Sequence, residues 1–493
     1  MMLRIQMTKA DKMTVKRNWL ARAGLSAMLL SYPAMGSAES LQDALISAYQ
    51  TNPDMLAQRA VLRQVDEGVP QAKSGFFPSI SATLSNSRSG LDFNDNGRFK
   101  TADLTAQQAL FRSGRTRLAI NAADARVLAA RARLRQTENS ILAQVVTAYA
   151  DVLRFQAVVE LNTNQVKVFE TQLKASKDRF EVGDLTRTDV AQSEASRANA
   201  LSNLVAARGF LSNASEAYRR LVGNSPANLE PLPALPVLPG TVGQANDLAA
   251  QNAPALIAAR FDEQAGRYDV KSIEAERLPT VGVRAGLNYQ ESVFPSVTGA
   301  GGASVTRGGN FFTQSVGIQA TIPLYQAGVN GSRIRQAQER RSQLMEGIAN
   351  AERSVTEAST NALVSVQTAR SLIESLQVAV DANALALEGT RQENQVGSRT
   401  IIEVLNAEQA LLNTRVNLVT AKRDEYVAAY NLLAATGQAE VAVLSLPVER
   451  YDSTANLKRV RSKWFDFDTN PNPKALPKPD KARASGSAPM VNP

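Results

Sequence analysis

The sequence predicts an α+β membrane protein made of two tandem structural repeats, each supplying two membrane strands and several long helices. Three observations predict this fold class. Glycines recur at one constant offset, four segments alternate apolar and polar residues, and two long stretches contain almost no glycine or proline. Together they indicate a barrel of strands that continues as a tube of helices.

The repeat is visible in the spacing of six glycines: Gly114, Gly183 and Gly223 recur at the same offset as Gly328, Gly397 and Gly437. The neighbouring residues agree, since Leu110-Phe-Arg-Ser-Gly114 matches Leu324-Tyr-Gln-Ala-Gly328. A repeat period of roughly 200 residues is too long for a solenoid. The chain is therefore interpreted as two fused copies of one structural half.

Four segments show the period of two that is typical of transmembrane strands. The clearest apolar face consists of Val281, Val283, Ala285, Leu287 and Tyr289. Strands are expected at about 76–93 and 99–112 in the first repeat and at about 278–294 and 310–326 in the second. Aromatic residues gather near the strand ends, where an interfacial girdle lies: Phe76, Phe93, Phe99, Phe111, Phe311, Phe312 and Tyr325. A soluble β-sandwich would also alternate, but it fits poorly with so few strands beside so much helix.

Four strands cannot close a membrane barrel, because about eight is the smallest number that does. In lipid, each unpaired backbone group at an open strand edge costs on the order of several kcal/mol. The chain is therefore expected to share one barrel with copies of itself.

The remaining sequence predicts helices of unusual length. Thr116 to Val182 contains neither glycine nor proline, and Ser332 to Val396 contains only Gly347 and Gly389. About 67 helical residues span on the order of 100 Å. Shorter first helices are expected at 41–73 and 244–277. Helices this long, rooted in membrane strands, are expected to project from the bilayer as a tube.

The composition argues against an enzyme. The chain has no histidine, the commonest general acid–base and metal ligand, and no cysteine. We therefore expect no catalytic residue, no cofactor and no metal site. The formal net charge of +9 lies at the ends, because residues 1–38 carry +5 and residues 449–493 carry +4. A nucleic-acid groove needs basic charge within the folded part, so nucleic acid is not an expected partner.

These patterns divide the chain into five segments. Residues 1–38 are interpreted as a secretory signal peptide, since a basic region precedes an apolar run and a small-residue cleavage site; an amphipathic helix is the alternative. The first repeat is expected at 39–226 with a hairpin tip near 183, and the second at 244–448 with a tip near 397. A Pro-rich linker at 227–243 joins them, and 449–493 is expected to be a flexible tail.

The order of these elements resembles TolC-type outer-membrane efflux proteins over nearly all of residues 39–440. The most specific matches are Arg179-Phe-Glu-Val-Gly183 with Thr188-Asp189-Val190, and Val396-Gly-Ser-Arg-Thr-Ile-Ile-Glu-Val-Leu405. The resemblance implies a homotrimer with a twelve-stranded barrel in the outer membrane of a Gram-negative bacterium and a large periplasmic tunnel. It implies a passive, gated exit duct for tripartite efflux or type I secretion. The implied partners are outer-membrane lipid, a periplasmic adaptor and an inner-membrane transporter of RND or ABC type.

The resemblance also implies a gate at the hairpin tips. Arg399 matches the family's gating arginine, and Thr188 and Asp189 match its partners. Asn394 stands where the family has a tyrosine that also holds the gate, so part of the latch is altered. The alternative is that Arg399 only caps a turn.

Two acidic residues occupy equivalent places, six residues past the tip glycines: Asp189 and Glu403. A ring of carboxylates in a narrow mouth repels anions and attracts cations. The resemblance implies a lumenal acidic ring at Glu403 and a second ring at the position of Asn406, where the amide predicts weaker cation focusing. Ordinary solvated carboxylates are the alternative.

The exposed tips are expected at Val182, Gly183, Val396 and Gly397, where the resemblance implies docking of the adaptor. The competing function is a trimeric adhesin or structural coiled-coil protein that its strands only anchor. A carboxylate-dependent hydrolase using Asp189 and Glu403 is remote, because no pocket-forming fold is expected around them.

Overall fold

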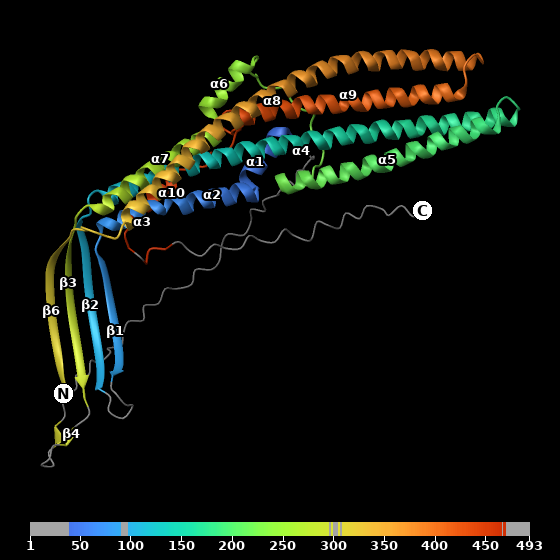
Figure 1. Ribbon diagram of the computed structural model, residues 1–493. Helices are drawn as coiled ribbons and strands as arrows, with labels where there is room; N and C mark the ends of the chain where they lie inside the picture. Colours follow the sequence, from blue (N-terminus) through green and yellow to red (C-terminus); the bar gives the residue numbers. More distant parts are fainter. Residues whose placement is uncertain are drawn as a thin grey trace, which may run out of the picture.

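The computed structural model describes residues 39–89, 97–294, 297–298, 304–305, 308–465 and 467–469. The expected signal peptide, Phe93, most of both strand-connecting loops and the tail from 470 lie outside them. The described chain has a sheet at one end, a long layer of helices, and two helical hairpin tips at the other end (Figure 1).

The two longest helices are α4 (Arg115–Glu181) and α8 (Val329–Gln395), of 67 residues each. Each begins after a glycine with positive φ, +80° at Gly114 and +79° at Gly328. Each then reverses into a shorter helix, α5 (Arg187–Val222) or α9 (Ile401–Ala435). The other helices are α1 (Leu41–Thr51), α2 (Pro53–Asp66), α3 (Gly68–Lys73), α6 (Val242–Asn252), α7 (Pro254–Glu274) and α10 (Ala455–Val460).

The first helix of each half is broken, contrary to the single helices expected at 41–73 and 244–277. Asn52 and Ala253 have ψ values of 126° and 117°, outside the helical range. Each precedes a proline, whose ring disfavours helical backbone in the residue before it. The break lets α1 and α6 leave the line of α2 and α7 (Figure 1).

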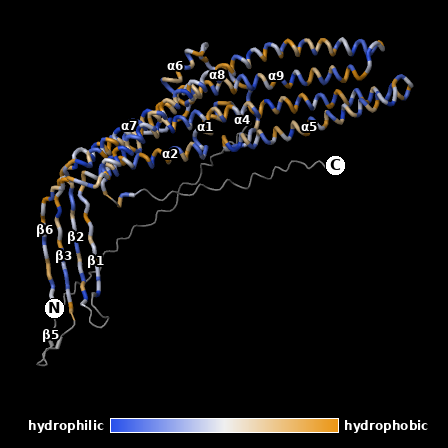
Figure 2. Tube along the Cα trace, in the orientation of Figure 1, coloured by the Kyte–Doolittle hydropathy of each residue, from blue (hydrophilic) through white to orange (hydrophobic). Residues whose placement is uncertain are grey.

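The four expected strands form one antiparallel sheet in the order β1-β2-β3-β6. Their bounds are β1 Ser79–Ser89, β2 Gly97–Phe111, β3 Thr280–Val293 and β6 Gly308–Thr321. A separate short pair, β4 (Val297–Thr298) and β5 (Ser304–Val305), lies in the connection between β3 and β6. Apolar and polar residues alternate along the long strands (Figure 2).

The register collects the apolar residues on one face of this sheet. Directly opposed residues share a face, and two such rows are Ile80–Ala106–Ala285–Val316 and Leu84–Ala102–Tyr289–Phe312. The other face is polar: Ser81 hydrogen bonds Thr105 at 2.8 Å, and Asn288 donates to Asp103. Since most of the large apolar side chains on the strands are exposed, the sheet has the two faces that a membrane barrel requires.

The helices repeat the order of the strands. α3 leads into β1, β2 leads into α4, η2 (Ala275–Arg277) joins α7 to β3, and β6 leads into α8. Among these helices, α4 packs against α2 and α7, and α7 packs against α8. Within the described residues, β1 and β6 each pair with one neighbouring strand. Sheet and helix layer are therefore both open at the same two edges.

The largest core lies midway along the helices, where α1 and the ends of α5 and α9 pack on α4. One window of α4 is apolar enough to cross a membrane by composition, but half of it is buried in the protein. The linker also contributes to this core, through Leu229, Leu232, Leu235 and Leu238. Their spacing of three matches an extended polyproline-type helix, which places one leucine per turn on the same side.

The first part of the expected flexible tail is folded instead. Val460 of α10 is fully buried, and Leu457 packs beside Val69 and Val127. Arg461 forms an ion pair with Asp124 of α4 at 3.1 Å. The two apolar side chains and this ion pair hold the chain against α2 and α4 after residue 449.

The two faces of the sheet predict different outcomes for neighbouring substitutions. Leu104→Arg, in the middle of β2 on the apolar face, is expected to destabilise the inserted protein by roughly 2–4 kcal/mol per chain. Thr105→Arg lies on the polar face and is expected to have little effect. Chemical unfolding of the protein in lipid vesicles measures the difference. Equal losses in the two variants would contradict this assignment of faces.

Candidate functional site

Both helical hairpins end in the same backbone motif. At the first tip, the amide of Gly183 donates to Phe180 O at 3.0 Å and that of Asp184 to Arg179 O at 2.9 Å. At the second, Gly397 and Ser398 donate in the same pattern to Asn394 O and Glu393 O. These are Schellman turns, which need a left-handed residue; Gly183 and Gly397 have φ of +83° and +80°.

The valine before each tip glycine points away from the protein. Val182 is 78% exposed and Val396 is 80% exposed. Exposed valines at the ends of two hairpins are apolar groups available to a partner, while the glycines beside them are already required by the turn.

Asp189 caps the start of α5. Its carboxylate accepts from the backbone amide of Thr186 at 3.0 Å and from the Thr186 hydroxyl at 2.7 Å. The hydrogen bond from the hydroxyl, followed by that from the amide, holds the pKa of Asp189 below its usual value. The resemblance implied that Thr188 and Asp189 are partners of Arg399 at the gate. Within the chain, the residue that hydrogen bonds the Asp189 carboxylate is Thr186.

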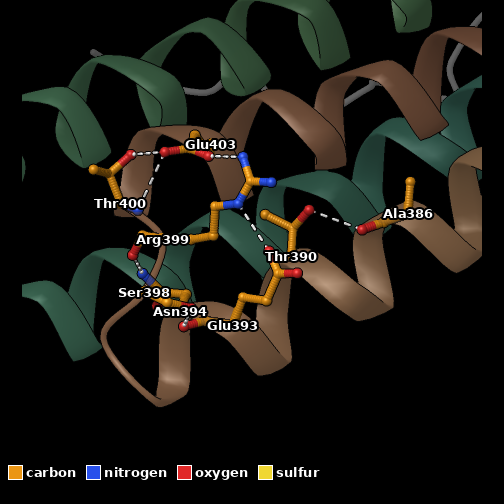
Figure 3. A network of polar contacts seen from close by, with 8 residues as sticks. All are labelled: Ala386, Thr390, Glu393, Asn394, Ser398, Arg399, Thr400 and Glu403. Atoms are coloured by element: carbon orange, nitrogen blue, oxygen red, sulfur yellow. Dashed lines mark hydrogen bonds and ion pairs between the residues drawn. The ribbon is translucent and has the colours of Figure 1, made fainter.

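Arg399 organises the second tip (Figure 3). Its Nη1 donates to Glu403 at 2.5 Å, and its Nε donates to Glu393 at 2.8 Å. The hydrogen bond from Arg399, followed by that from Thr400, lowers the pKa of Glu403, and the two carboxylates raise the pKa of Arg399. All three side chains are at least one-third exposed. Exposed ion pairs are individually weak, so this network can be broken by a competing partner.

Asn394 supports the same turn. Its side-chain amide donates to the carbonyl of Arg399 at 2.8 Å, and the hydroxyl of Ser398 donates to the carbonyl of Glu393 at 3.0 Å. Asn394 therefore ties the end of α8 to the residue just before the cap of α9. This fixes the backbone from which the Arg399 side chain extends.

The two tips lie at different levels, which separates Arg399 from Asp189 within one chain. Ile401, just past the second tip, shares a buried cluster with Phe169 and Ala200, which lie well before and after the first tip. At 1.5 Å per residue the second hairpin stops short of the first by on the order of 10 Å. Figure 1 shows the same offset. Arg399 and Asp189 therefore lie at different levels within one chain.

Two further positions near the second tip, Asn406 and Glu408, have distinct surroundings. Asn406 is exposed on the side of α9 away from Ile401, Val404 and Leu405. Glu408 is buried and pairs with Arg391 of α8. Within the part of the chain that the structure describes, no group of three or more acidic side chains could hold a metal ion.

Three contributors to this site were missed in the sequence: Thr186, Glu393 and Glu408. Thr186 carries a readable signal, because threonine followed three residues later by an acidic residue is a capping-box pattern. Thr400 and Glu403 repeat it. Glu393 and Glu408 carry none, since their roles depend on which residues the hairpin turn and its two helices bring together.

Known proteins resemble the chain along most of its length. A family model described as "Outer membrane efflux protein" matches residues 44–224 and 246–438. Outer membrane efflux protein BepC of Brucella suis is 34% identical over 431 residues, 87% of this chain and 92% of the relative. Outer membrane protein TolC of Escherichia coli is 26% identical over 84% of this chain and 85% of its own. The crystal structure of the outer membrane protein VceC from Vibrio cholerae has a TM-score of 0.67 at 21% identity, covering 80% of this chain and 96% of that chain.

The cap at the first tip predicts a local effect of one threonine. Thr186→Ala is expected to destabilise the start of α5 by roughly 0.5–2 kcal/mol, the usual loss for removing such a cap. Hydrogen exchange of amides 187–190 is expected to accelerate accordingly. The matched control is Thr188→Ala, two residues along and exposed, for which protection should be unchanged. Equal acceleration in both variants would contradict the role of Thr186.

The network at the second tip predicts a loss of order in acid. Because the folded-state pKa of Glu403 is lowered, its contribution is complete above the ordinary glutamate pKa and is lost as the pH falls through the lowered value. Hydrogen exchange of amides 393–403, normalised to intrinsic rates at each pH, is expected to show constant protection near neutrality and a decline in acid. Glu403→Gln should remove that decline. A variant that kept it would show that another group titrates.

Proposed function

The chain belongs to the outer membrane efflux protein family, and we propose that it forms the passive, gated exit duct of a tripartite efflux pump or type I secretion system. It is a protein of the Gram-negative outer membrane with a large periplasmic helical portion. The proposal assigns it no catalytic step and no cofactor, since a duct needs only a passage and a way to close it.

The observation that carries the proposal is the shared order of strands and helices. Each of the four main strands is continuous with one helix of the layer, and both layers are open at the same two edges. Three copies would join β1 of one chain to β6 of the next and give a twelve-stranded barrel. The helices would close in register below it, so that barrel and tube share one lumen.

The hairpin tips are proposed as the gate. In a trimer, three copies of the Arg399 network would surround the narrow end of the tube. Closure of the gate is proposed to shift the tips so that Arg399 reaches Thr188 and Asp189 of a neighbouring copy. Asn394 holds the turn that presents Arg399. Glu403 and Asn406 are proposed to face the lumen, where the carboxylates favour cations.

A periplasmic adaptor is the proposed opener. It would dock on Val182, Gly183, Val396 and Gly397, where the exposed valines offer apolar contact. Coupling to an inner-membrane transporter of RND or ABC type would supply the energy, because the duct contains no motor of its own. The weakness of exposed ion pairs makes such opening reversible.

Single-channel conductance in a planar bilayer tests both the duct and the gate. The wild-type protein is expected to show small, cation-selective steps. Arg399→Ser is expected to show larger ones, because each chain loses two ion pairs at its second tip. Arg415→Ser, an exposed arginine farther along α9, removes the same charge away from the tip and should behave as wild type. Large wild-type steps unchanged by Arg399→Ser would remove Arg399 from the gate. Absence of conductance after verified insertion would favour the structural-anchor function.

A further inference from the structure

Three large aromatic side chains lie exposed just after α10. Trp464 is 70% exposed, Phe465 is 61% exposed and Phe467 is 87% exposed. Their rings contact one another, with centroids 5.7 Å apart for Trp464–Phe465 and 6.0 Å apart for Phe465–Phe467. A cluster of exposed aromatic rings of this kind marks an interaction surface. Trp464, Phe465 and Phe467 are called the aromatic cluster below.

The aromatic cluster is held at the junction of helices and strands. Trp464 stacks on Phe77, two residues before β1, with ring centroids 6.4 Å apart. Just upstream, Lys73 Nζ donates to the carbonyl of Arg461 at 2.9 Å. Asn456 donates to the carboxylate of Asp66 at 2.8 Å. α10 therefore holds the aromatic cluster beside the end of the sheet that adjoins the helices (Figure 1).

This level is the boundary of the apolar face of the sheet. Exposed apolar side chains surround the helix-proximal ends of all four long strands: Phe76, Phe77, Phe111, Leu278, Ile322, Leu324 and Tyr325. Tryptophan and other aromatic side chains concentrate at the level of lipid headgroups, where apolar rings meet a polar surface. Phe77 belongs to this belt, and its ring contact with Trp464 joins the aromatic cluster to it.

The aromatic cluster lies on the outer side of the helix layer. Arg461 pairs with Asp124, and Arg135 pairs with Glu440. Asp124 and Arg135 are eleven residues apart, which is about three helical turns and therefore the same face of α4. The irregular segment around Glu440 and α10 thus share one flank, and an open tube requires both to be outside it.

Basic groups accompany the rings. Lys73 lies beside Arg461, and Lys463 directly precedes Trp464 and pairs with Asp468 at 2.9 Å. Lysine next to interfacial aromatic residues can reach the phosphate groups of lipids while its stem remains among apolar atoms. The surface therefore combines aromatic rings with cationic groups at the membrane boundary.

We propose that the aromatic cluster is an interfacial anchor that inserts among the phospholipid headgroups of the leaflet nearest the helices. It extends the grip of the chain on the membrane beyond the barrel, and through α10 it connects that leaflet to α2 and α4. This role rests on the proposed function for the placement of α10 outside the tube. Conductance tests the tube, whereas lipid contact of Trp464 tests the anchor. The competing occupant is the end of β6 from a neighbouring copy.

The test uses the fluorescence of Trp464 itself. The chain has two tryptophans, Trp19 and Trp464, so Trp19→Phe leaves Trp464 as the sole reporter. The full chain is reconstituted into phosphatidylethanolamine–phosphatidylglycerol vesicles, with or without lipids brominated near the headgroup end of the acyl chains. Bromine quenches tryptophan only at close contact. Strong quenching of Trp464 by the brominated lipid is the expected result.

Two further single-tryptophan proteins set the scale, both carrying Trp19→Phe and Trp464→Phe. Ile322→Trp reports from an exposed apolar position just after β6, at the helix-proximal end of the sheet, and Phe210→Trp reports from exposed α5. Quenching of Trp464 comparable to that of Ile322→Trp supports the anchor. Quenching no greater than that of Phe210→Trp overturns it. In that outcome, a blue-shifted emission would place Trp464 against another copy of the chain, and access to acrylamide would place it in water.

Discussion

The requirement that backbone groups in lipid be hydrogen bonded shapes this whole chain. In the part of the chain that the structure describes, the four strands hydrogen bond one another, and the outer strands β1 and β6 each have one edge without a partner strand. Unpaired strand edges are unstable in a bilayer, so a single chain does not form a complete barrel. The helix layer inherits the same incompleteness, because its helices follow the order of the strands. Closure of the sheet and closure of the tube are thus one event.

The tips obey a different physical rule from the rest of the molecule. Along α4 the helices are joined by buried apolar contacts, which give a stable wall. At the second tip the contacts are exposed ion pairs and hydrogen bonds around Arg399, whose strength falls with salt and with competing partners. The ion pair between exposed Arg391 of α8 and buried Glu408 of α9 joins these two helices near the second tip. If the proposed gate opens at the tips, these buried contacts would keep the wall of helices intact.

Much of the fold could be read from local sequence, because its signals are periodic. Val281 to Tyr289 alternate as a strand must, and Gly183 and Gly397 stand where a helix must reverse. The helix breaks at Pro53 and Pro254 were also legible, since proline restricts the residue before it, but the long apolar pattern around them concealed the interruption. The folded start of the tail was not legible, because Leu457 and Val460 are too few to distinguish a docked turn from a solvated one.

The candidate site was less predictable than the fold. Arg399, Asp189 and Glu403 lie close to the hairpin tips, as their spacing from Gly183 and Gly397 indicates, but the side chains that bind them within the chain were not identified. Thr186 precedes Asp189 by three residues and shows a capping pattern, so this contact could have been predicted from the sequence. The offset between the two hairpins could not be predicted from the local sequence. It arises from how Ile401 packs against Phe169 and Ala200, a contact between segments far apart in the sequence.

The equal length of α4 and α8 makes the helix layer a molecular ruler. Both run for 67 residues between a left-handed glycine and a reversing turn. Each residue adds about 1.5 Å of reach and turns the following side chains by about 100°. A change of length in one helix would both misalign its tip and rotate its buried face out of the wall. Insertions and deletions are therefore compatible with this architecture only as matched changes of whole turns in both repeats, so the depth to which the protein extends is encoded in discrete steps.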